Sequence, residues 1–345
     1  MLHLSLLDIP SMQIVCKALC LRMSSLPVKQ IIRVLAEILV LILYICRKLL
    51  IMRAICCVGH ITKDKIITPK HTVYMAGGTS FYFSYGFNQL PHKVPFRLIT
   101  KIGDEDIKVV DDMRRAGIDV EVYPSEHTVF FENKYGENQN DRTQRVLAKA
   151  DPFTIDELAG AEAEVFHIGS LLNDDFSSKV IRYLSTKGRI SIDAQGFLRR
   201  VESQRVYPVD WQGKAEILAC THVLKVNEHE MEVITGLTNP RTAALKLAEW
   251  GVKESLITLG SYGSLIYAEG KFYEIPAYEP TDMVDATGCG DTYSAGYLYC
   301  RSQGMGYEEA GKFAAAMCTL KLEHSGPFDK GIEEVRRVLR ANKTL

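Results

Sequence analysis

The chain has 345 residues, of which 47% are hydrophobic and 24% are charged, with 25 Gly and 12 Pro. This is the composition of an ordinary globular protein, so it excludes extended disorder, collagen-like repeats and low complexity. Lys and Arg number 41 against 42 Asp and Glu. This balance argues against a nucleic acid or an anionic membrane as a partner recognised by bulk charge.

The nine cysteines are scattered and form neither a C-x-x-C pair nor a Cys/His spacing typical of metal sites. Their odd number in so long a chain favours reduced, mostly buried thiols over a disulfide framework. We therefore expect a cytoplasmic protein.

The first 51 residues differ from the rest. The run 34–46 is apolar apart from Glu37, but a membrane-spanning helix needs about 20 apolar residues. Three interpretations remain: a weak membrane anchor, a helical extension that needs a partner surface, or an over-long start with Met52 as the true first residue. We favour the third, because residues 52–59 read as a complete opening strand that ends in a glycine turn. No membrane is expected to bind the remainder.

From residue 52 onward, short apolar runs alternate with helical patterns, and this alternation predicts a doubly wound α/β fold with a mostly parallel sheet flanked by helices. We expect one domain over 52–330 and a C-terminal helix or tail over 331–345. Helices are predicted at 178–186 and 242–250, among others. Strands are predicted at 54–58, 97–101, 164–168, 189–193, 222–226 and 255–259.

Two stretches, at about 61–75 and 120–135, alternate apolar and polar residues with no helix between their halves. This pattern is typical of antiparallel strands exposed on one face, so we expect a small β flap, or lid, beside the main sheet. The polar segment 136–145 is predicted to be a loop.

The most informative segment is DATGCGD at 285–291. Gly288 and Gly290 let the backbone turn sharply and approach a ligand, and a helix that begins here would present its N–H groups to an anion. A carboxylate such as Asp291 repels phosphate, so its presence is explained if it accepts a proton from a hydroxyl that attacks the phosphate. Alternatively, Asp285 and Asp291 are ordinary helix N-caps.

This segment resembles the second signature of the ribokinase-like (PfkB) carbohydrate kinase family, and further motifs of that family follow in the expected order. They are GHITKD at 59–64, Gly77-Gly78, IGDE at 102–105, N-x-x-E at 227–230 and TLGSYG at 258–263. The resemblance covers about 52–330. It implies ATP-dependent phosphoryl transfer to a hydroxyl of a sugar or cyclic polyol.

The resemblance also implies roles for single residues. Asp291 would be the catalytic base, and Gly288, Cys289 and Gly290 the anion hole. Asp64, Gly77, Gly78 and Tyr82 would lie beside the acceptor. Asn227, Thr258, Gly260, Gly263 and Thr287 would lie near the ATP phosphates, and Glu230 would act on Mg²⁺ through water. Each has a simpler alternative: Asp64 a surface turn, residues 227–230 a helix start, and residues 258–263 a hairpin turn.

One departure concerns the acceptor. The family often has Asn where this chain has Tyr82, which weakens the case for ribokinase-type or fructokinase-type ring recognition. The runs GGTSF at 77–81, Gly59-His60-Ile61 and RVLAKADP at 145–152 are more similar to the myo-inositol kinase branch. Two other functions remain open: a nucleoside kinase that stacks a purine on Phe81 or Tyr82, and a non-catalytic sugar or nucleotide sensor. The resemblance leaves K⁺ dependence open and suggests a homodimer formed through the lid.

Overall fold

The computed structural model describes residues 30, 32–33, 35–40, 54–135 and 142–342. The chain divides into two compact units, Met1–Leu50 and Ile51–Leu345. In the first unit the described residues are helical, and Arg33 Nε lies 3.2 Å from Glu37 Oε1. Met52 and part of the apolar run 34–46 lie outside the described residues. Within the described ranges, no helix has the length and apolar character needed to cross a bilayer.

A nine-stranded sheet forms the centre of the second unit, in the order β15-β14-β13-β12-β9-β8-β1-β4-β5. The strands from β13 to β5 are parallel, and β14 and β15 extend the sheet as antiparallel strands. All six predicted strands and the doubly wound α/β fold are thereby confirmed. The bounds are β1 (Ile55–Val58), β4 (Phe96–Ile102), β5 (Val120–Pro124), β8 (Val165–Gly169), β9 (Arg189–Asp193), β12 (Thr221–Asn227), β13 (Glu254–Thr258), β14 (Ser264–Ala268) and β15 (Lys271–Ile275).

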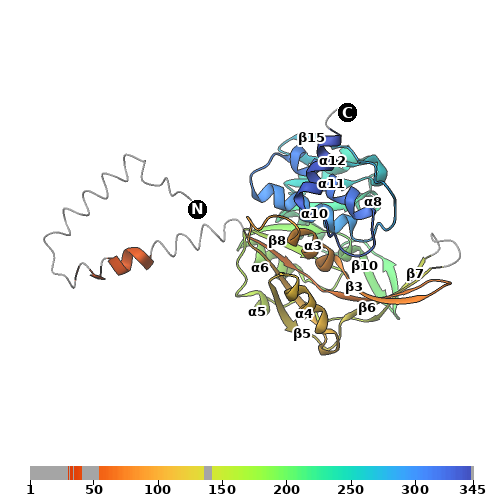
Figure 1. Cartoon of the computed structure of the whole chain (residues 1–345), viewed down its shortest axis with the longest axis horizontal. Helices are drawn as coiled ribbons and strands as arrows, with labels where there is room; N and C mark the ends of the chain where they lie inside the picture. Colours follow the sequence, from red (N-terminus) through yellow and green to blue (C-terminus); the bar gives the residue numbers. More distant parts are fainter. Residues whose placement is uncertain (1–29, 31, 34, 41–53, 136–141, 343–345) are drawn as a thin grey trace. The chain divides into compact units, whose positions relative to one another are not determined.

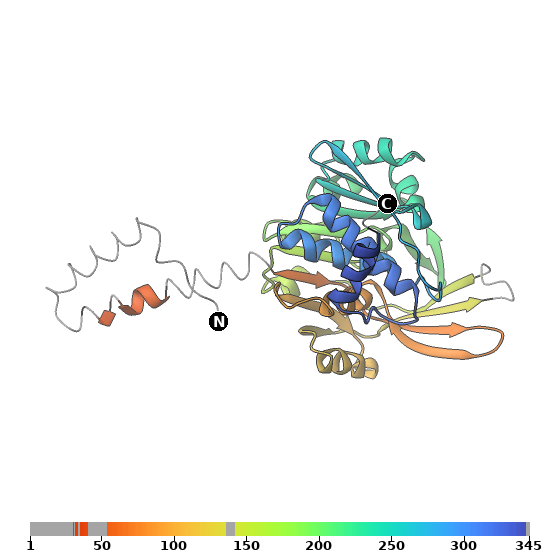
Figure 2. The same ribbon diagram turned by 45° about the horizontal axis from the view of Figure 1, so that its top comes forward.

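Helices cover both faces of this sheet (Figures 1 and 2), so its strands are apolar on both sides. In β1, Ile55 and Cys57 belong to one core cluster, and Cys56 and Val58 to the other. The first cluster includes α3 (Thr79–Asn88), α4 (Lys108–Arg115), α10 (Cys289–Ser302), α11 (Tyr307–Leu322) and α12 (Ile332–Ala341). The second includes α5 (Ile155–Leu158), α6 (Ser178–Ser185), α7 (Lys214–Ala219), α8 (Glu228–Thr235) and α9 (Pro240–Glu249).

A second, six-stranded sheet has the order β10-β11-β7-β6-β2-β3. Its strands are β2 (Thr62–Ile67), β3 (Thr72–Gly77), β6 (Val129–Tyr135), β7 (Arg142–Ala148), β10 (Arg199–Glu202) and β11 (Arg205–Pro208). Figure 1 shows β3, β6 and β7 extending together from the helical part of this unit. The pairing is antiparallel except between β2 and β6.

The predicted flap is wrong in one part. Residues 120–124 form β5, which pairs in parallel with β4 at the edge of the main sheet. Alternating polarity fits any strand with one exposed face, and the edge position of β5 satisfies it equally well. Residues 142–145, predicted to be loop, belong to β7, and residues 136–141 lie outside the described residues.

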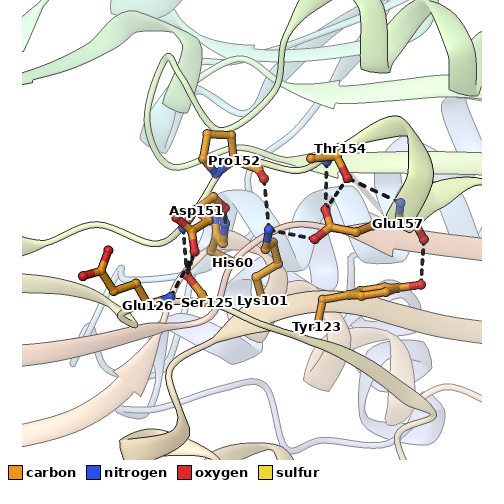
Figure 3. A network of polar contacts seen from close by, with 9 residues as sticks. All are labelled: His60, Lys101, Tyr123, Ser125, Glu126, Asp151, Pro152, Thr154 and Glu157. Atoms are coloured by element: carbon orange, nitrogen blue, oxygen red, sulfur yellow. Dashed lines mark hydrogen bonds and ion pairs between the residues drawn. The ribbon is translucent and has the colours of Figure 1, made fainter.

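The chain that returns from β7 to the main sheet is anchored by polar contacts, some of them partly buried (Figure 3). Lys101 Nζ on β4 donates to Glu157 Oε1 at 2.8 Å and to the Pro152 carbonyl at 3.1 Å. The Asp151 carboxylate accepts from the Glu126 N–H at 3.0 Å, and this bond helps to hold the pKa of Asp151 below its ordinary value. The run 145–152, which resembles the myo-inositol kinases, therefore covers the end of β7 and the start of the connection to the main sheet.

The chain order of the strands creates a crevice. From β1 the chain continues to β4 and β5 on one side, whereas β8, β9, β12 and β13 follow on the other. Such a reversal leaves a gap at the carboxyl ends of the adjacent strands β1 and β8, where ligands of open α/β sheets bind.

Candidate active site

A cavity of about 490 Å³ is lined by residues of the second sheet and by residues that follow the carboxyl ends of the main strands. This is the size of a small-molecule site. The second sheet contributes Thr62, Asp64, Phe131, Asn133, Gln144 and Arg199. The ends of the main strands and the helices contribute Gly78, Thr79, Tyr82, Leu171, Gln195, Lys225, Asn227, Glu230, Thr258, Ala286, Thr287, Gly288, Gly290 and Asp291.

The glycine turn begins α10, as predicted. Gly288 is its N-cap with φ 78°, a backbone region that favours glycine, and a Cβ there would lie 2.4 Å from Tyr82 Cδ1. The N–H of Cys289 was expected to contact an anion. In the structure it donates to the Ala286 carbonyl at 3.2 Å instead. Gly290 is in the first turn of α10, where N–H groups have no partner within the helix.

Asp291, also in the first turn of α10, lines the cavity. Its removal from bulk water and the nearby charge of Asp193 raise the pKa of Asp291 to about 7. The Lys225 ammonium and a hydrogen bond with Thr79 oppose this rise. A carboxylate that titrates near neutral pH is suited to accept a proton during catalysis.

Lys225 is a buried cation beside the glycine turn. Its Nζ lies 3.0 Å from Asp193 Oδ2, and a Cβ on Gly290 would lie 2.7 Å from the same Nζ. Burial favours the neutral amine, but Asp193, Glu230 and Asp291 outweigh it and raise the pKa of Lys225 above its ordinary value. The ammonium therefore stays charged next to the N-terminus of α10.

Asn227 and Glu230 form a reciprocal capping box at the start of α8. Asn227 Oδ1 accepts from the Glu230 N–H at 2.9 Å, and Glu230 Oε2 accepts from the Asn227 N–H at 2.8 Å. Residues 227–230 are thus the start of a helix, as the simpler alternative predicted. Both residues also line the cavity, and burial raises the pKa of Glu230.

Thr258, at the end of β13, and Thr287 also line the cavity. Gly260 and Gly263 shape the tight turn between β13 and β14, with φ of 56° and 90°, and are absent from the cavity lining. Asp285 acts as a turn cap, because its Oδ1 accepts from the Thr287 N–H at 2.9 Å.

Three of the residues predicted to lie beside the acceptor, Asp64, Gly78 and Tyr82, line the same cavity. Asp64 on β2 lines the cavity, and a Cβ on Gly77 would lie 2.4 Å from its Oδ2. Asp64 is paired in register with Phe131 on β6, so both project from the same face of the second sheet. On that face Gln144 donates to Asn133 at 2.9 Å. The surface turn proposed for Asp64 is therefore wrong.

The residues fit magnesium only indirectly. Among the described residues, no group of three or more His, Cys, Asp or Glu could hold a metal ion. The Glu230 carboxylate lines the cavity, and Mg²⁺ in kinases keeps several waters and binds substrate phosphates. A role for Glu230 through water is compatible with this arrangement.

Sequence reasoning missed several lining residues, chiefly Lys225, Gln195, Arg199, Asn133 and Gln144. Lys225 carried a signal, because a lone Lys inside an apolar strand is rarely buried without a charged partner. The amides and Arg199 carried none, since the pairing within the second sheet brings them to the cavity.

Comparison with known proteins shows which family this fold belongs to. A sequence model of the pfkB family carbohydrate kinases matches residues 49–333. The cytidine kinase of Thermococcus kodakarensis is 29% identical over 265 residues, which cover 73% of this chain and 90% of that protein. The ribokinase of Arabidopsis thaliana is 32% identical over 117 residues, 32% of this chain and 31% of that protein.

Among solved structures, a pyrophosphate-dependent kinase of the ribokinase family, complexed with a pyrophosphate analogue and myo-inositol, superimposes with a TM-score of 0.73 at 31% identity. The match covers 83% of this chain and 99% of that one. The sulfate complex of such a kinase gives a TM-score of 0.74 at the same identity and coverage. The resemblance drawn from the motifs is confirmed: the chain belongs to the pfkB family of carbohydrate kinases and is a ribokinase-type sugar or nucleoside kinase.

Proposed function

We propose that this kinase transfers the γ-phosphoryl group of ATP to a hydroxyl of a cyclic polyol or sugar. One observation carries the proposal: Asp291 and the Gly288–Gly290 turn border the same cavity as Asp64. One cavity thus contains a base, an anion-binding helix N-terminus and a carboxylate suited to bind hydroxyls. This is the arrangement that phosphoryl transfer to an alcohol requires.

In this mechanism Asp64 accepts hydrogen bonds from acceptor hydroxyls, and Asp291 takes the proton of the attacking hydroxyl. The N–H groups of Gly288 and Gly290 receive the charge that spreads over the transferred phosphoryl. Mg²⁺ would neutralise phosphate charge, with Asn227 and Glu230 in its outer shell. Closure of the second sheet over the acceptor would exclude water.

A cyclic polyol is the preferred acceptor class. The second sheet presents Asp64 and the amides of Asn133 and Gln144 to the cavity, and such groups suit a ring that carries hydroxyls on every side. The solved relative with myo-inositol supports this choice. The similarity to a cytidine kinase and the aromatic rings of Tyr82 and Phe131 in the lining favour a nucleoside as the second candidate.

The phosphoryl donor could be ATP or pyrophosphate, because the two solved kinases described above are pyrophosphate-dependent. Tyr262, Met283 and Val284 are 87%, 78% and 58% exposed. They lie within four residues in the sequence of Thr258 and Ala286, which line the cavity. A nucleotide base would cover such apolar surface, whereas pyrophosphate has no base to bury. This favours ATP.

The test is turnover of ATP or pyrophosphate with a panel of myo-inositol, ribose, fructose, cytidine and adenosine, with and without K⁺. The proposal expects phosphorylated polyol or sugar from ATP. Turnover with pyrophosphate alone would overturn the donor, and turnover of nucleosides alone would overturn the acceptor. Binding of ATP without turnover of any acceptor would favour a sensor. The Asp291→Asn variant is the control for contaminating kinases.

A further inference from the structure

Arg199 reaches the cavity by a route that the family motifs do not describe. After β9 ends at Asp193, a short 3-10 turn at Gly196–Leu198 leads into β10, which begins at Arg199. Strand β10 belongs to the second sheet (Figure 1), although the chain enters it directly from the main sheet. Arg199 therefore lies at the junction of the two sheets and lines the cavity.

The neighbours of Arg199 fix its guanidinium in place. With its side-chain oxygen turned toward Arg199, Gln195 accepts hydrogen bonds from Arg199 Nη1, at 2.6 Å, and from Nη2. The Gln195 N–H donates to Asp193 Oδ1 at 3.1 Å, and Asp193 Oδ2 accepts from Lys225 at 3.0 Å. One polar chain thus links two cations, Arg199 and Lys225, through Gln195 and Asp193.

The charges around the cavity indicate what these cations bind. Within the described ranges, the charged side chains of the lining are three carboxylates, Asp64, Glu230 and Asp291, and two cations, Lys225 and Arg199. Lys225 lies against Gly290, on the α10 side. Arg199 approaches from the second sheet, and its charge lowers the pKa of Glu230 against the rise caused by burial. The contacts of Arg199 lead through Gln195 and Asp193 to Lys225, which lies against Gly290 in the glycine turn.

We propose that Arg199, which enters the cavity from the second sheet, binds the phosphoryl group during transfer together with the N-terminus of α10. The inference rests on the proposed kinase function. In that step the bond from the γ-phosphorus to its bridging oxygen breaks, and the electron pair leaves on ADP. The acceptor oxygen forms the new bond to phosphorus, and its proton goes to Asp291. Arg199 makes no covalent bond and holds two phosphoryl oxygens with its planar fork.

The placement also explains why an arginine is used. A phosphoryl group in transfer spreads negative charge over its equatorial oxygens, and an anion hole at one helix end reaches only one side of it. A bidentate guanidinium that comes from the second sheet adds a second contact. Because β10 is part of the second sheet, the acceptor-binding sheet itself supplies this contact.

The test compares Arg199→Gln and Arg199→Lys with Arg200→Gln as the matched control. Arg200 is the next residue of β10, is half exposed and pairs with Glu202 at 3.1 Å. Arg199→Gln is expected to lower kcat about 10²–10³-fold with little change in acceptor KM. Arg199→Lys should recover part of the loss, because it keeps the charge but not the fork. Arg200→Gln should behave as wild type.

Inorganic phosphate binding, measured by calorimetry on the full chain without turnover, separates this inference from the proposed function. Phosphate should bind wild type and Arg200→Gln alike, and Arg199→Gln at least about tenfold more weakly. Equal phosphate affinity in Arg199→Gln, or no binding to wild type, would overturn the inference. So would a raised acceptor KM at unchanged kcat, which would make Arg199 an acceptor contact. A wild-type protein that binds phosphate through Arg199 but turns over no acceptor would instead reject the kinase proposal.

Discussion

Asp193 and Lys225 are register partners on two adjacent parallel strands and form a buried ion pair, with 3.0 Å between Oδ2 and Nζ. Their side chains are 1% and 7% exposed. Such a pair is held in place by its neighbours, and removal of one member leaves an uncompensated charge in the interior. The pair lies beside the turn that carries Asp291, so its stability and the chemistry of the site are linked.

This pair predicts a stability cycle. Lys225→Met should lower the free energy of unfolding by about 3–5 kcal/mol, because it strands the Asp193 carboxylate. The double variant Asp193→Asn/Lys225→Met should lose less than Lys225→Met alone. Denaturant unfolding measures all of these values. A double variant less stable than Lys225→Met would show that the two residues do not act as a pair.

Asp291→Asn should lower the activity of the enzyme but raise its stability. The amide keeps the size of the side chain but removes the proton acceptor, so kcat should fall about 10²–10⁴-fold. The raised pKa of Asp291 means that the fold favours the protonated form, so the wild type loses stability as the pH rises from the ordinary Asp value to about 7 and does not regain it above. The melting temperature of the variant at pH 8 should therefore exceed that of wild type, with a smaller difference at pH 5. A lower melting temperature at both pH values would argue against this burial effect.

The pH dependence of kcat/KM for the acceptor follows from the same pKa. A base must be ionised to act, so the rate should fall about tenfold per pH unit below about 7 and reach a plateau above it. Asp193→Asn removes a charge that raises the pKa of Asp291 and should shift this limb to lower pH. Lys225→Met removes a charge that lowers it and should shift the limb to higher pH. Shifts in the same direction would contradict the assignment.

Asp64→Asn should act on the acceptor. The change halves the accepting capacity for hydroxyl hydrogens, so the acceptor KM should rise about tenfold or more while the KM for the donor stays near wild type. The matched control is Lys65→Gln on the opposite face of β2, where Lys65 pairs with Glu132 at 2.9 Å. An unchanged acceptor KM in Asp64→Asn would remove this residue from the site.

The connection between the sheets depends on Lys101, which is 4% exposed. Lys101→Met should reduce the free energy of unfolding by about 3 kcal/mol, because it leaves the Glu157 carboxylate and the Pro152 carbonyl (Figure 3) without their buried donor. Lys149→Gln is the control, since Lys149 pairs with Asp174 at the surface and should change stability by less than about 1 kcal/mol. Equal effects of the two variants would contradict a special role for the buried contact.

The turn at 285–291 could be predicted from the local sequence alone. A Gly-x-Gly followed by an acid at a helix start has few backbone solutions, and the positive φ of Gly288 is one of them. The same holds for the capping box of Asn227 and Glu230, because its bonds span only three residues. The flap was less predictable, since alternating polarity does not distinguish β5 from β6.

The amino-acid sequence by itself determined the order of strands and helices, the apolar character of both faces of the main sheet, and the turn that begins α10. These depend on contacts between residues close in the chain. The tertiary structure alone decided that Arg199, Gln144 and Asn133 share a cavity with Asp291, and that Lys225 pairs with Asp193. Those neighbours come from strands whose pairing is set by long-range packing, and a periodic pattern in one strand does not encode its partner.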